Sequence, residues 1–339
     1  MRNLFIGIMT GTSADALDGC IVSFDRKFEL LEKETVDLGK SYKTEYEQCI
    51  KEGYKSSEDS ARVLNLENIL NSKTIQLLDR LISKSNIKKD SIKMAALSGQ
   101  TMFHTYEKSF QIGNSQSIAD TTGINICSDF RNYDIKKGGM GAPLIPIFHK
   151  YLYAKNDVNR IIFNIGGIAN GTYLRDGQIS IASDVGPGNC LLDSYCENYL
   201  GTPFDNMGKI SSNGEINHNL LNSLLSATIN MAYPRADDKN DYYKLMHEPL
   251  NELCNEDILR TLTEFTALKI YEFYEFCDQP SEVIFHGGGV KNSFLMKVIK
   301  EKLGCDLRTT DNEIDSKYVE AAAFAYLAYK NLGEIFVAK

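Results

Sequence analysis

A glycine- and hydroxyl-rich turn separates two apolar runs in the stretch GIMTGTSADALDGCIVSFD, residues 7–25. The run before the turn, 4–9, predicts a buried strand, and the run after it, 19–22, predicts its hairpin partner. A tight hairpin turn requires only a glycine or an asparagine with positive φ. This turn also carries two hydroxyls and two carboxylates, on Thr12, Ser13, Asp15 and Asp18. It has more polar groups than folding requires, which favours a ligand-binding role.

The same layout recurs in the second half of the chain. The stretch RIIFNIGGIANGTYLRDG, residues 160–177, again predicts a strand, a small-residue turn and a second strand. A third apolar run, VIFHGGGVKN at 283–292, ends in three glycines and leads into an apolar-periodic helix. Three strands followed by small-residue turns therefore mark the chain.

Between these strands the apolar spacing predicts helices. Helices are expected within 57–85, 251–276 and 316–331, the last capped by Asp315 or Ser316. Strands that alternate with long helices indicate an α/β architecture. The glycines and prolines of 129–146 suggest a connection between two domains.

The composition excludes several classes of function. The 339 residues include 37 Lys and Arg against 45 Asp and Glu, and this net charge of −8 argues against a nucleic-acid binder. The eight cysteines form no CxxC pair, so neither a disulfide framework nor a zinc site is indicated. The first apolar run is too short for a secretion signal or a membrane span, so we expect a cytoplasmic protein without membrane partners.

The two turns and the glycine run together favour a polyphosphate ligand. Backbone N–H groups in successive turns form concave anion sites, and a nearby aspartate can hold Mg²⁺ through water. The sequence has no GxxxxGK[ST], which excludes a P-loop, and no GxGxxG after the first strand. Each turn taken alone is equally well explained as a structural turn.

Two carboxylates occupy positions suited to chemistry. The strand 178–183 is expected to end at Asp184, beside the N-terminus of a helix that follows 186–189. There Asp184 would either cap the helix or act as a general base held ionised by the N–H donors. Glu320 shares a helix face with apolar residues, an unfavourable place for an unpaired charge. It therefore either reaches a basic partner across a cleft or lies in the first helical turn.

In its turns and glycines the chain resembles the actin, hexokinase and Hsp70 superfamily. The resemblance implies an α/β fold of two ribonuclease-H-like (actin-like ATPase) domains with a cleft between them that holds the active site. The N-terminal domain would comprise 1–130 plus 316–339 and carry the first phosphate loop. The C-terminal domain, 131–315, would carry the second phosphate loop, the catalytic aspartate and the glycines that contact adenosine.

A more specific resemblance rests on eight motifs in a fixed order. They are MTGTSADALDG (9–19), SGQTMFH (98–104), QIGNSQSIADTTGINICSDFR (111–131), GGMGAPLIPIFH (138–149), NIGGIAN (164–170), DVGPGN (184–189), GGGVKN (287–292) and EAAAFAYLAY (320–329). In this order the chain is similar to the anhydro-N-acetylmuramic acid kinase family. The resemblance implies a kinase that uses ATP, Mg²⁺ and water to open a 1,6-anhydro ring in peptidoglycan recycling. The product would be N-acetylmuramic acid 6-phosphate, and the kinase would be a homodimer.

The family resemblance also implies roles for individual residues. Asp184 would be the base that activates water, Arg131 and Glu320 would contact the sugar, and Mg²⁺ would be held through water with Asp18 as the candidate. The nucleotide would be bound by the first turn, the second turn and the glycine run. These residues are Gly11, Thr12, Ser13, Ala14, Asp15, Ala16, Leu17, Asp18, Asn164, Gly166, Gly167, Gly287, Gly288, Gly289 and Asn292.

The chain departs from the family pattern at a few places. Ser98, Met140 and Ala16 stand where the family usually has His, Gln and Gly, and AYPRADDKNDYYKLM (232–246) stands near the place of an expected Pro-Pro-Lys-Ser-Thr-Gly segment. A kinase for another anhydro sugar, such as levoglucosan, and a nucleotide-binding sensor without turnover remain as alternatives. A pure sensor needs no base, so Asp184 argues against it. Arg131 would either bind a lactyl carboxylate or tie the domains together through Asp129 or Asp134.

Overall fold

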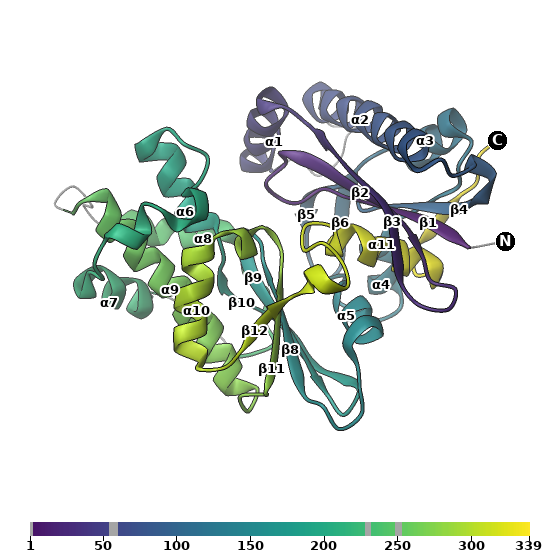
Figure 1. Cartoon of the computed structure of the whole chain (residues 1–339). Helices are drawn as coiled ribbons and strands as arrows, with labels where there is room; N and C mark the ends of the chain where they lie inside the picture. Colours follow the sequence, from purple (N-terminus) through teal and green to yellow (C-terminus); the bar gives the residue numbers. More distant parts are fainter. Residues whose placement is uncertain (1–2, 54–59, 228–231, 248–252) are drawn as a thin grey trace. The chain divides into compact units, whose positions relative to one another are not determined.

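Two compact units make up the chain in a computed structural model that describes residues 3–53, 60–227, 232–247 and 253–339 (Figure 1). The first unit comprises Met1–Phe148 and Tyr318–Lys339, and the second comprises His149–Lys317. The boundaries expected from the sequence lie at 130/131 and 315/316. The division of roles between two domains stays a prediction.

The first unit contains a six-stranded mixed sheet. Its order is β13-β7-β4-β1-β2-β3, in which β1, β2 and β3 are antiparallel, β1, β4 and β7 are parallel, and β13 runs antiparallel to β7. The strands are β1 (Leu4–Met9), β2 (Ala16–Ser23), β3 (Glu29–Asp37), β4 (Ile92–Leu97), β7 (Ile126–Ser128) and β13 (Glu334–Phe336). A separate hairpin joins β5 (Gln100–His104) to β6 (Ser109–Ile112). The predicted strand pair around the first turn is confirmed.

Helices cover both faces of this sheet. A Cβ built on Gly7 would lie 1.8 Å from the carbonyl oxygen of Ala321 in α11 (Val319–Tyr329), and one built on Gly19 would lie 2.9 Å from Leu77 in α2 (Ala61–Ser85). Gly7 pairs with the neighbour of Gly19, and side chains alternate along a strand, so α11 and α2 lie on opposite faces. Only glycine permits this close approach. The other helices of the unit are α1 (Lys40–Glu52), α3 (Ser115–Thr122) and α4 (Phe130–Lys136).

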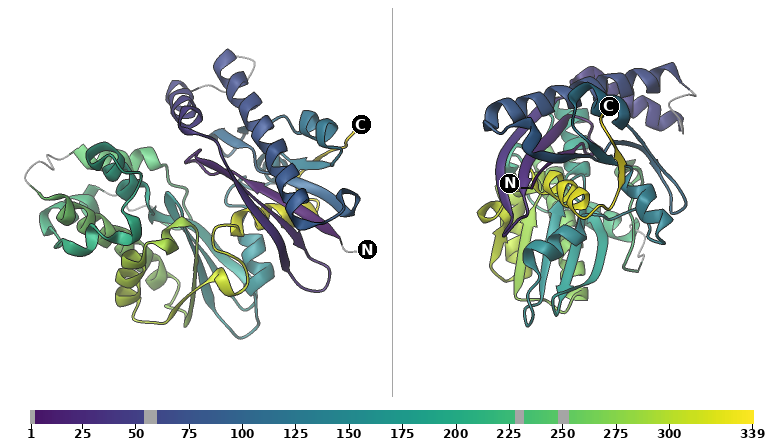
Figure 2. Two further views of the ribbon diagram at one scale, coloured as in Figure 1. Left: turned by 45° about the horizontal axis from the view of Figure 1, so that its top comes forward. Right: turned by 90° about the vertical axis from the view of Figure 1, so that its right-hand side faces the viewer.

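The second unit contains a five-stranded sheet, visible in both views of Figure 2. Its strands, in order, are β10 (Gln178–Pro187), β9 (Ile168–Arg175), β8 (Arg160–Ile165), β11 (Glu282–His286) and β12 (Leu307–Thr309). α9 (Asn255–Phe276) and α10 (Ser293–Leu303) bury one face around Phe163, Phe273 and Phe285. The end of α5 (Pro146–Tyr153) packs on the other face against Ile162 and Ile284. The remaining helices are α6 (Cys190–Tyr195), α7 (His218–Ala227) and α8 (Lys239–Tyr243).

The two units repeat one topology. In each, three antiparallel strands are followed by parallel strands beside the first, as β3-β2-β1-β4-β7 and as β10-β9-β8-β11-β12. This strand order confirms the expected class, an α/β fold of two ribonuclease-H-like units. Among the helices of the described residues, none combines the length and apolar composition needed to cross a membrane.

Several local predictions were confirmed and others were wrong. The expected helices are present as α2, α9 and α11, although 57–59 and 251–252 lie outside the described residues. Neither Asp315 nor Ser316 caps α11, because Tyr318 is the residue at its N-terminus. The expected connection at 129–146 contains α4 and reaches the start of α5. Its glycines and prolines flank helices rather than forming one continuous linker.

Candidate active site

The first turn joins β1 to β2 and is closed by its own polar groups. Gly11 O accepts a hydrogen bond from Ala14 N at 3.1 Å, and Asp15 Oδ1 accepts from Ser13 Oγ at 2.7 Å and from Ala16 N at 3.0 Å. Ala14 is buried and has φ 51°, a conformation that side chains rarely adopt. Thr12 and Ser13 are exposed at the tip. Hydrogen bonds thus fix the conformation of the turn, while the side chains at its tip are exposed to solvent.

Two polar residues, Gln100 and Ser98, hydrogen-bond to the residues at the start of the turn. The Gln100 side chain accepts from Thr10 Oγ1 at 2.9 Å and donates to Gly11 O at 3.0 Å, and Gln100 is fully buried. Ser98 Oγ accepts from Thr10 N at 3.2 Å. Ser98, which stands where the family usually has His, therefore hydrogen-bonds to the residue just before the turn that the sequence predicts to bind phosphate.

Asp18 lies on β2 and ends a chain of hydroxyls. Its Oδ1 accepts from Thr35 Oγ1 at 2.6 Å, and Thr35 Oγ1 lies 3.0 Å from Tyr318 Oη. Because Thr35 gives its single proton to the carboxylate, Tyr318 must be the donor in the second bond. Thr35 and Tyr318 were not expected from the sequence, since they lie far from Asp18 along the chain.

Glu320, Asp18 and Arg131 act on one another electrostatically. Burial and the neighbouring Asp18 carboxylate raise the pKa of Glu320 to about 7, while Arg131 works in the opposite direction. Glu320 lies in the first turn of α11, as one of the two sequence interpretations expected. Both other groups belong to the same unit as Glu320. The unit therefore gathers two carboxylates and one guanidinium from three distant segments.

Arg131 is anchored on α4. Its Nη1 donates to Gly141 O at 3.1 Å. Burial and the Arg131 charge lower the pKa of His104, although a hydrogen bond from His104 to the Met140 backbone opposes this. The family departure at Met140 therefore borders the Arg131 and His104 side chains.

The second turn, Gly166–Gly167, joins β8 to β9 in the second unit. Its carbonyls accept from the residues that follow β10: Gly188 N bonds to Gly167 O at 2.9 Å, and Asn189 N bonds to Gly166 O at 2.8 Å. A Cβ on Gly188 would lie 2.3 Å from Gly166 O, so this contact requires a glycine at the second glycine position of DVGPGN. Asn164, which is buried, precedes the turn on β8.

The three glycines after β11 differ in role. A Cβ on Gly287, where φ is 89°, would lie 2.3 Å from Asn164 Oδ1, and one on Gly289 would lie 2.2 Å from Ile165 Cγ2. Packing therefore accounts for these two. A Cβ on Gly288 would meet nothing within 4 Å, so Gly288 faces open space. Asn292, also expected to bind nucleotide, caps α10 by accepting from Leu295 N at 3.0 Å.

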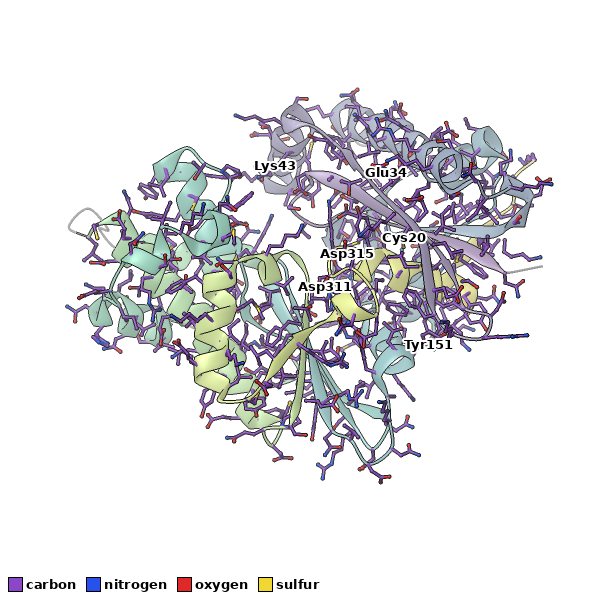
Figure 3. The ribbon with its side chains drawn as sticks, in the orientation of Figure 1. Cys20, Glu34, Lys43, Tyr151, Asp311 and Asp315 are labelled. Carbon is purple, nitrogen blue, oxygen red and sulfur yellow. The ribbon has the colours of Figure 1, made fainter. Side chains whose placement is uncertain are left out.

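An acidic loop holds the start of the glycine run. Gly287 N donates to Ser316 O at 3.2 Å, and Asp311 Oδ1 accepts from Ser316 N and Ser316 Oγ, both at 2.8 Å. Figure 3 labels Asp311 and Asp315 on this loop. Asp315 and Ser316, expected as helix caps, are thus used in the loop instead: Asp315 Oδ1 accepts from Lys317 N at 3.0 Å.

Asp184 does not end its strand, contrary to the sequence-based expectation. β10 continues to Pro187, and Asp184 pairs with Asn170 just before an irregularity in register that precedes Gly186. The helix that follows, α6, has Asn189 at its N-terminus. Asp184 Oδ2 instead accepts from Asp237 N at 2.9 Å. The carboxylate therefore receives a main-chain donor from a distant segment, and helix capping is wrong.

That segment, 233–237, was noted from the sequence only as a departure from the family. It lies beside β10, since Asp184 N donates to Arg235 O at 3.0 Å and Arg235 N donates to Ser183 Oγ at 2.9 Å. The one signal in the sequence was the position of this segment near the missing family motif. No local pattern connects it with Asp184.

The open glycines allow a test of fit for ATP. Cβ atoms built on Gly11 and Gly167 would meet nothing closer than 3.7 Å and 3.9 Å, and Gly288 is more open still. A phosphate or a nucleoside can therefore approach the backbone at all three positions. Hydroxyls and carboxylates beside the first turn are oxygen donors of the kind that hydrated Mg²⁺ prefers. Within the described ranges no group of three or more His, Cys, Asp or Glu side chains is arranged to hold a metal ion.

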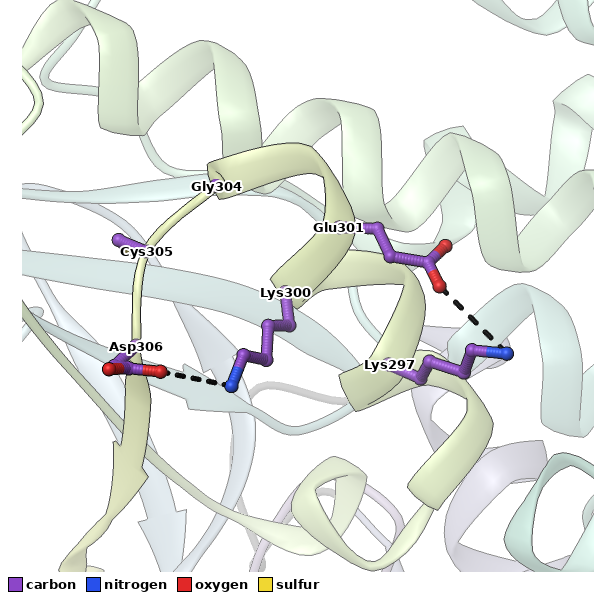
Figure 4. A pocket seen from close by; sticks show the side chains of 6 residues that line it. All are labelled: Lys297, Lys300, Glu301, Gly304, Cys305 and Asp306. Carbon is purple, nitrogen blue, oxygen red and sulfur yellow. Dashed lines mark hydrogen bonds and ion pairs between the residues drawn. The ribbon is translucent and has the colours of Figure 1, made fainter.

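Two of the hollows in the described part of the chain differ in their relation to the expected site. One of about 470 Å³ lies at the end of α10, where Lys300 pairs with Asp306 at 3.0 Å and Lys297 lies 3.8 Å from Glu301 (Figure 4). None of the expected site residues lines it. The other, of about 270 Å³, lies where β4 and β7 end, and its lining includes Ser98. Of these two, only the second borders Ser98, which hydrogen-bonds to Thr10 at the start of the first turn.

Comparison with solved structures agrees with this fold. The chain is similar to the activator of the 2-hydroxyisocaproyl-CoA dehydratase from Clostridium difficile, solved with bound ADPNP. The TM-score is 0.52 at 14% identity, and the match covers 98% of this chain and 96% of that one. At this identity the likeness is one of fold.

Comparison with families and curated relatives identifies the chain more closely. Residues 3–338 match the family described as anhydro-N-acetylmuramic acid kinase. The kinase of that name from Gamma-proteobacterium EBAC31A08 is 35% identical over 98% of this chain and 92% of its own, and that from Shewanella putrefaciens is 34% identical over 98% and 93%.

The strand order and the family match together define a kinase built of two ribonuclease-H-like units. The chain belongs to the anhydro-N-acetylmuramic acid kinase family. The resemblance recognised in the eight motifs is confirmed.

Proposed function

We propose that the protein opens the 1,6-anhydro ring of anhydro-N-acetylmuramic acid with water and phosphorylates the freed 6-oxygen with ATP. The products are N-acetylmuramic acid 6-phosphate and ADP. The observation that carries the proposal is Asp184, a carboxylate held by the Asp237 N–H in a chain that matches the kinase family from residue 3 to residue 338.

In the first half of the reaction Asp184 accepts a proton from water. The water oxygen bonds to the anomeric carbon while the bond from that carbon to the 6-oxygen breaks, and its electron pair stays on the 6-oxygen. A positioned general base contributes roughly 10²- to 10⁴-fold to such a step. Asp184 suits this role because its Oδ2 accepts a main-chain hydrogen bond that favours the ionised form.

In the second half the 6-oxygen attacks the γ-phosphorus and ADP leaves. Phosphoryl transfer needs positioning and charge neutralisation more than covalent help from the protein. The turns at Gly11 and Gly167 would hold the phosphates, and Gly288 would lie against adenosine. Mg²⁺, held through water beside Asp18, would neutralise charge on the phosphates.

Arg131 and Glu320 are proposed to select the sugar. A guanidinium pairs with a carboxylate through two parallel hydrogen bonds, and the lactyl group of the muramic sugar supplies that carboxylate. Glu320, with a pKa of about 7, can donate or accept a hydrogen bond to a sugar hydroxyl near neutral pH.

The test is ADP release with a panel of two anhydro sugars, anhydro-N-acetylmuramic acid and levoglucosan. Mass spectrometry of the product follows, to show addition of both water and phosphate. We expect turnover on the muramic sugar and, for Asp184→Asn, loss of turnover with ATP binding retained. Preference for levoglucosan would reassign the substrate, and ATP binding without turnover on any sugar would leave a sensor. Near wild-type turnover by Asp184→Asn would remove Asp184 from the mechanism.

The family resemblance also leads us to expect a homodimer in the cytoplasm. Sedimentation velocity measures the oligomeric state directly, and a monomer at micromolar concentration would contradict the expectation.

A further inference from the structure

The segment 233–237 lies beside the part of β10 that carries Asp184. Its main chain runs beside β10 and makes four hydrogen bonds to residues 183 and 184, one of them from Ser183 Oγ to Arg235 O at 3.3 Å. Asp184 N donates to Arg235 O at 3.0 Å, Arg235 N donates to Ser183 Oγ at 2.9 Å, and Asp237 N donates to Asp184 Oδ2 at 2.9 Å. Both the backbone and the carboxylate of Asp184 are therefore held by one short segment.

A buried ion pair fixes the shape of this segment. Arg235 Nε donates to Asp237 Oδ1 at 2.9 Å, and the two side chains are 6% and 5% exposed. Arg235 Nη2 donates to Val185 O at 2.6 Å, immediately after Asp184, and the guanidinium lies 4.9 Å from the centre of the Tyr233 ring. Tyr242 Oη donates to Asp237 Oδ2 at 2.5 Å. The guanidinium thus bonds both to the segment and to the strand that carries Asp184.

This geometry links the ion pair to the carboxylate. The Asp237 side chain is held by Arg235 and Tyr242, and the same residue supplies the N–H that bonds to Asp184 Oδ2. Val185 has no pairing partner in the β9–β10 register, because the register shifts between Asp184 and Gly186. Arg235 satisfies the Val185 carbonyl at this irregularity. Without the guanidinium, the Val185 carbonyl loses its donor, and the Asp237 side chain loses a partner that fixes the position of this residue and so of its N–H.

We propose that Arg235 and Asp237 are positioning residues that hold Asp184 in the orientation needed to accept a proton from water. The proposal rests on the proposed function, in which Asp184 is the base. The buried pair acts through the Asp237 N–H and the Val185 carbonyl, and neither side chain needs to touch the sugar.

Other charged and titratable groups pack near this part of β10. Lys269 on α9 lies against Gly186, where a Cβ would be 2.6 Å from the lysine Cβ, and its Nζ bonds to Glu272 at 2.5 Å. Burial and the Asp237 carboxylate raise the pKa of Tyr242, which keeps its proton as a donor. Burial also raises the pKa of Tyr233 to about 12. Neither phenol therefore contributes to the acidic limb of the pH-rate profile, and Glu320, with a pKa of about 7, contributes alike in the wild type and in each variant.

The experiment compares Arg235→Met, Arg235→Lys and Asp237→Asn in the full chain, with kcat, both KM values and the pH dependence of kcat measured. We expect kcat to fall about 10²-fold in Arg235→Met, since small misplacements of reacting groups have effects of this size, with KM for ATP within about 2-fold. Loss of the donor to the ionised carboxylate moves the acidic limb of the kcat profile up by about 0.5–1 pH unit. Arg235→Lys keeps the charge but cannot span Asp237 and Val185, so its kcat should be intermediate.

The matched control is Arg260→Met. Arg260 pairs with Glu264 at 2.8 Å in the same unit, on α9, and its side chain is likewise largely buried. This variant tests for general destabilisation and should leave the acidic limb in place. The proposal would be overturned if Arg260→Met shifted the acidic limb of the kcat profile as much as Arg235→Met does. It would also be overturned if a folded Arg235→Met variant kept a normal kcat and an unshifted acidic limb.

Two further results separate this proposal from the proposed function. If Asp184→Asn keeps its turnover, the assignment of the base itself fails. If Asp184→Asn is inactive while the Arg235 and Asp237 variants behave as wild type, only the positioning role fails. Should Arg235→Met not fold, Asp237→Asn decides, because it retains the main-chain N–H and an acceptor for Tyr242 while removing the ion pair. It must show the same shift of the limb for the proposal to stand.

Discussion

Replacing Glu320 by glutamine should stabilise the protein at alkaline pH and leave its stability nearly unchanged in acid. Burial and Asp18 raise the pKa of Glu320 from the usual 4.5 to about 7 in the folded state. Between these values the folded chain binds more protons than the unfolded chain. Stability therefore falls as pH rises through this window. Glutamine keeps the size and the neutral state and removes this dependence.

The size of the effect follows from the shift. Each pKa unit corresponds to about 1.4 kcal/mol, so the difference between 4.5 and about 7 gives about 3 kcal/mol at full ionisation. Part of Glu320 remains exposed, and solvent screening reduces this to about 2 kcal/mol. For a unit of this size that equals a rise in Tm of about 4–8 °C.

The assay is differential scanning calorimetry of wild type and Glu320→Gln from pH 4 to pH 8, without ligands. The difference between the two proteins removes the contributions of all other titrating groups that the substitution does not touch. We expect equal Tm values near pH 4 and a gap that opens between pH 5 and 7.5. Asp120→Asn, which changes an exposed carboxylate of the same unit, is the control and should give no such gap.

A constant difference across the pH range would refute the reasoning, because it would mean that the pKa of Glu320 is the same in the folded and unfolded states. A glutamine variant that is less stable at pH 8 would also refute it. That result would show that the attraction of Arg131 outweighs both burial and the repulsion from Asp18.

Four other predictions concern the sugar, the glycine run and the cation. Arg131→Lys should lower kcat/KM about 10- to 100-fold on the muramic sugar but not on levoglucosan, the loss expected for a charge-assisted hydrogen bond; equal losses on both sugars would contradict carboxylate recognition. Gly288→Ala should leave Tm unchanged yet raise KM for ATP. Gly287→Ala should cost at least about 1 kcal/mol of stability, because its φ is positive and its Cβ would meet Asn164. Thr35→Val should raise the Mg²⁺ concentration for half-maximal rate, because it removes the hydroxyl that orients the Asp18 carboxylate; an unchanged Mg²⁺ profile would separate Asp18 from the cation.

Local patterns in the sequence were sufficient for the fold class. Apolar runs on either side of small-residue turns at 7–25 and 160–177 predicted the two hairpins, and apolar spacing predicted α2, α9 and α11. These features depend on residues close together in the chain, so alternation and helical period report them directly. The order of the eight motifs likewise sufficed for the family.

The expectation that the strand ends at Asp184 was wrong for a physical reason. Glycine and proline at 186–188 indicated the end of a strand, yet β10 continues through Pro187 because it keeps pairing with β9 across an irregularity in register. Whether a strand ends depends on its neighbour in the sheet, and no local pattern contains that neighbour.

The sequence by itself determined the two strand-turn-strand repeats, the glycine run and the kinase family, since each is written in neighbouring residues. Only the tertiary structure decided which groups support them. Asp184 is held by a segment more than fifty residues later, and Thr35 lies beside Tyr318 across 283 positions. It also separated Gly288, which faces open space, from Gly287 and Gly289, which packing requires. Such contacts arise when sheets and helices pack, and a contact between distant segments leaves no periodicity in the chain.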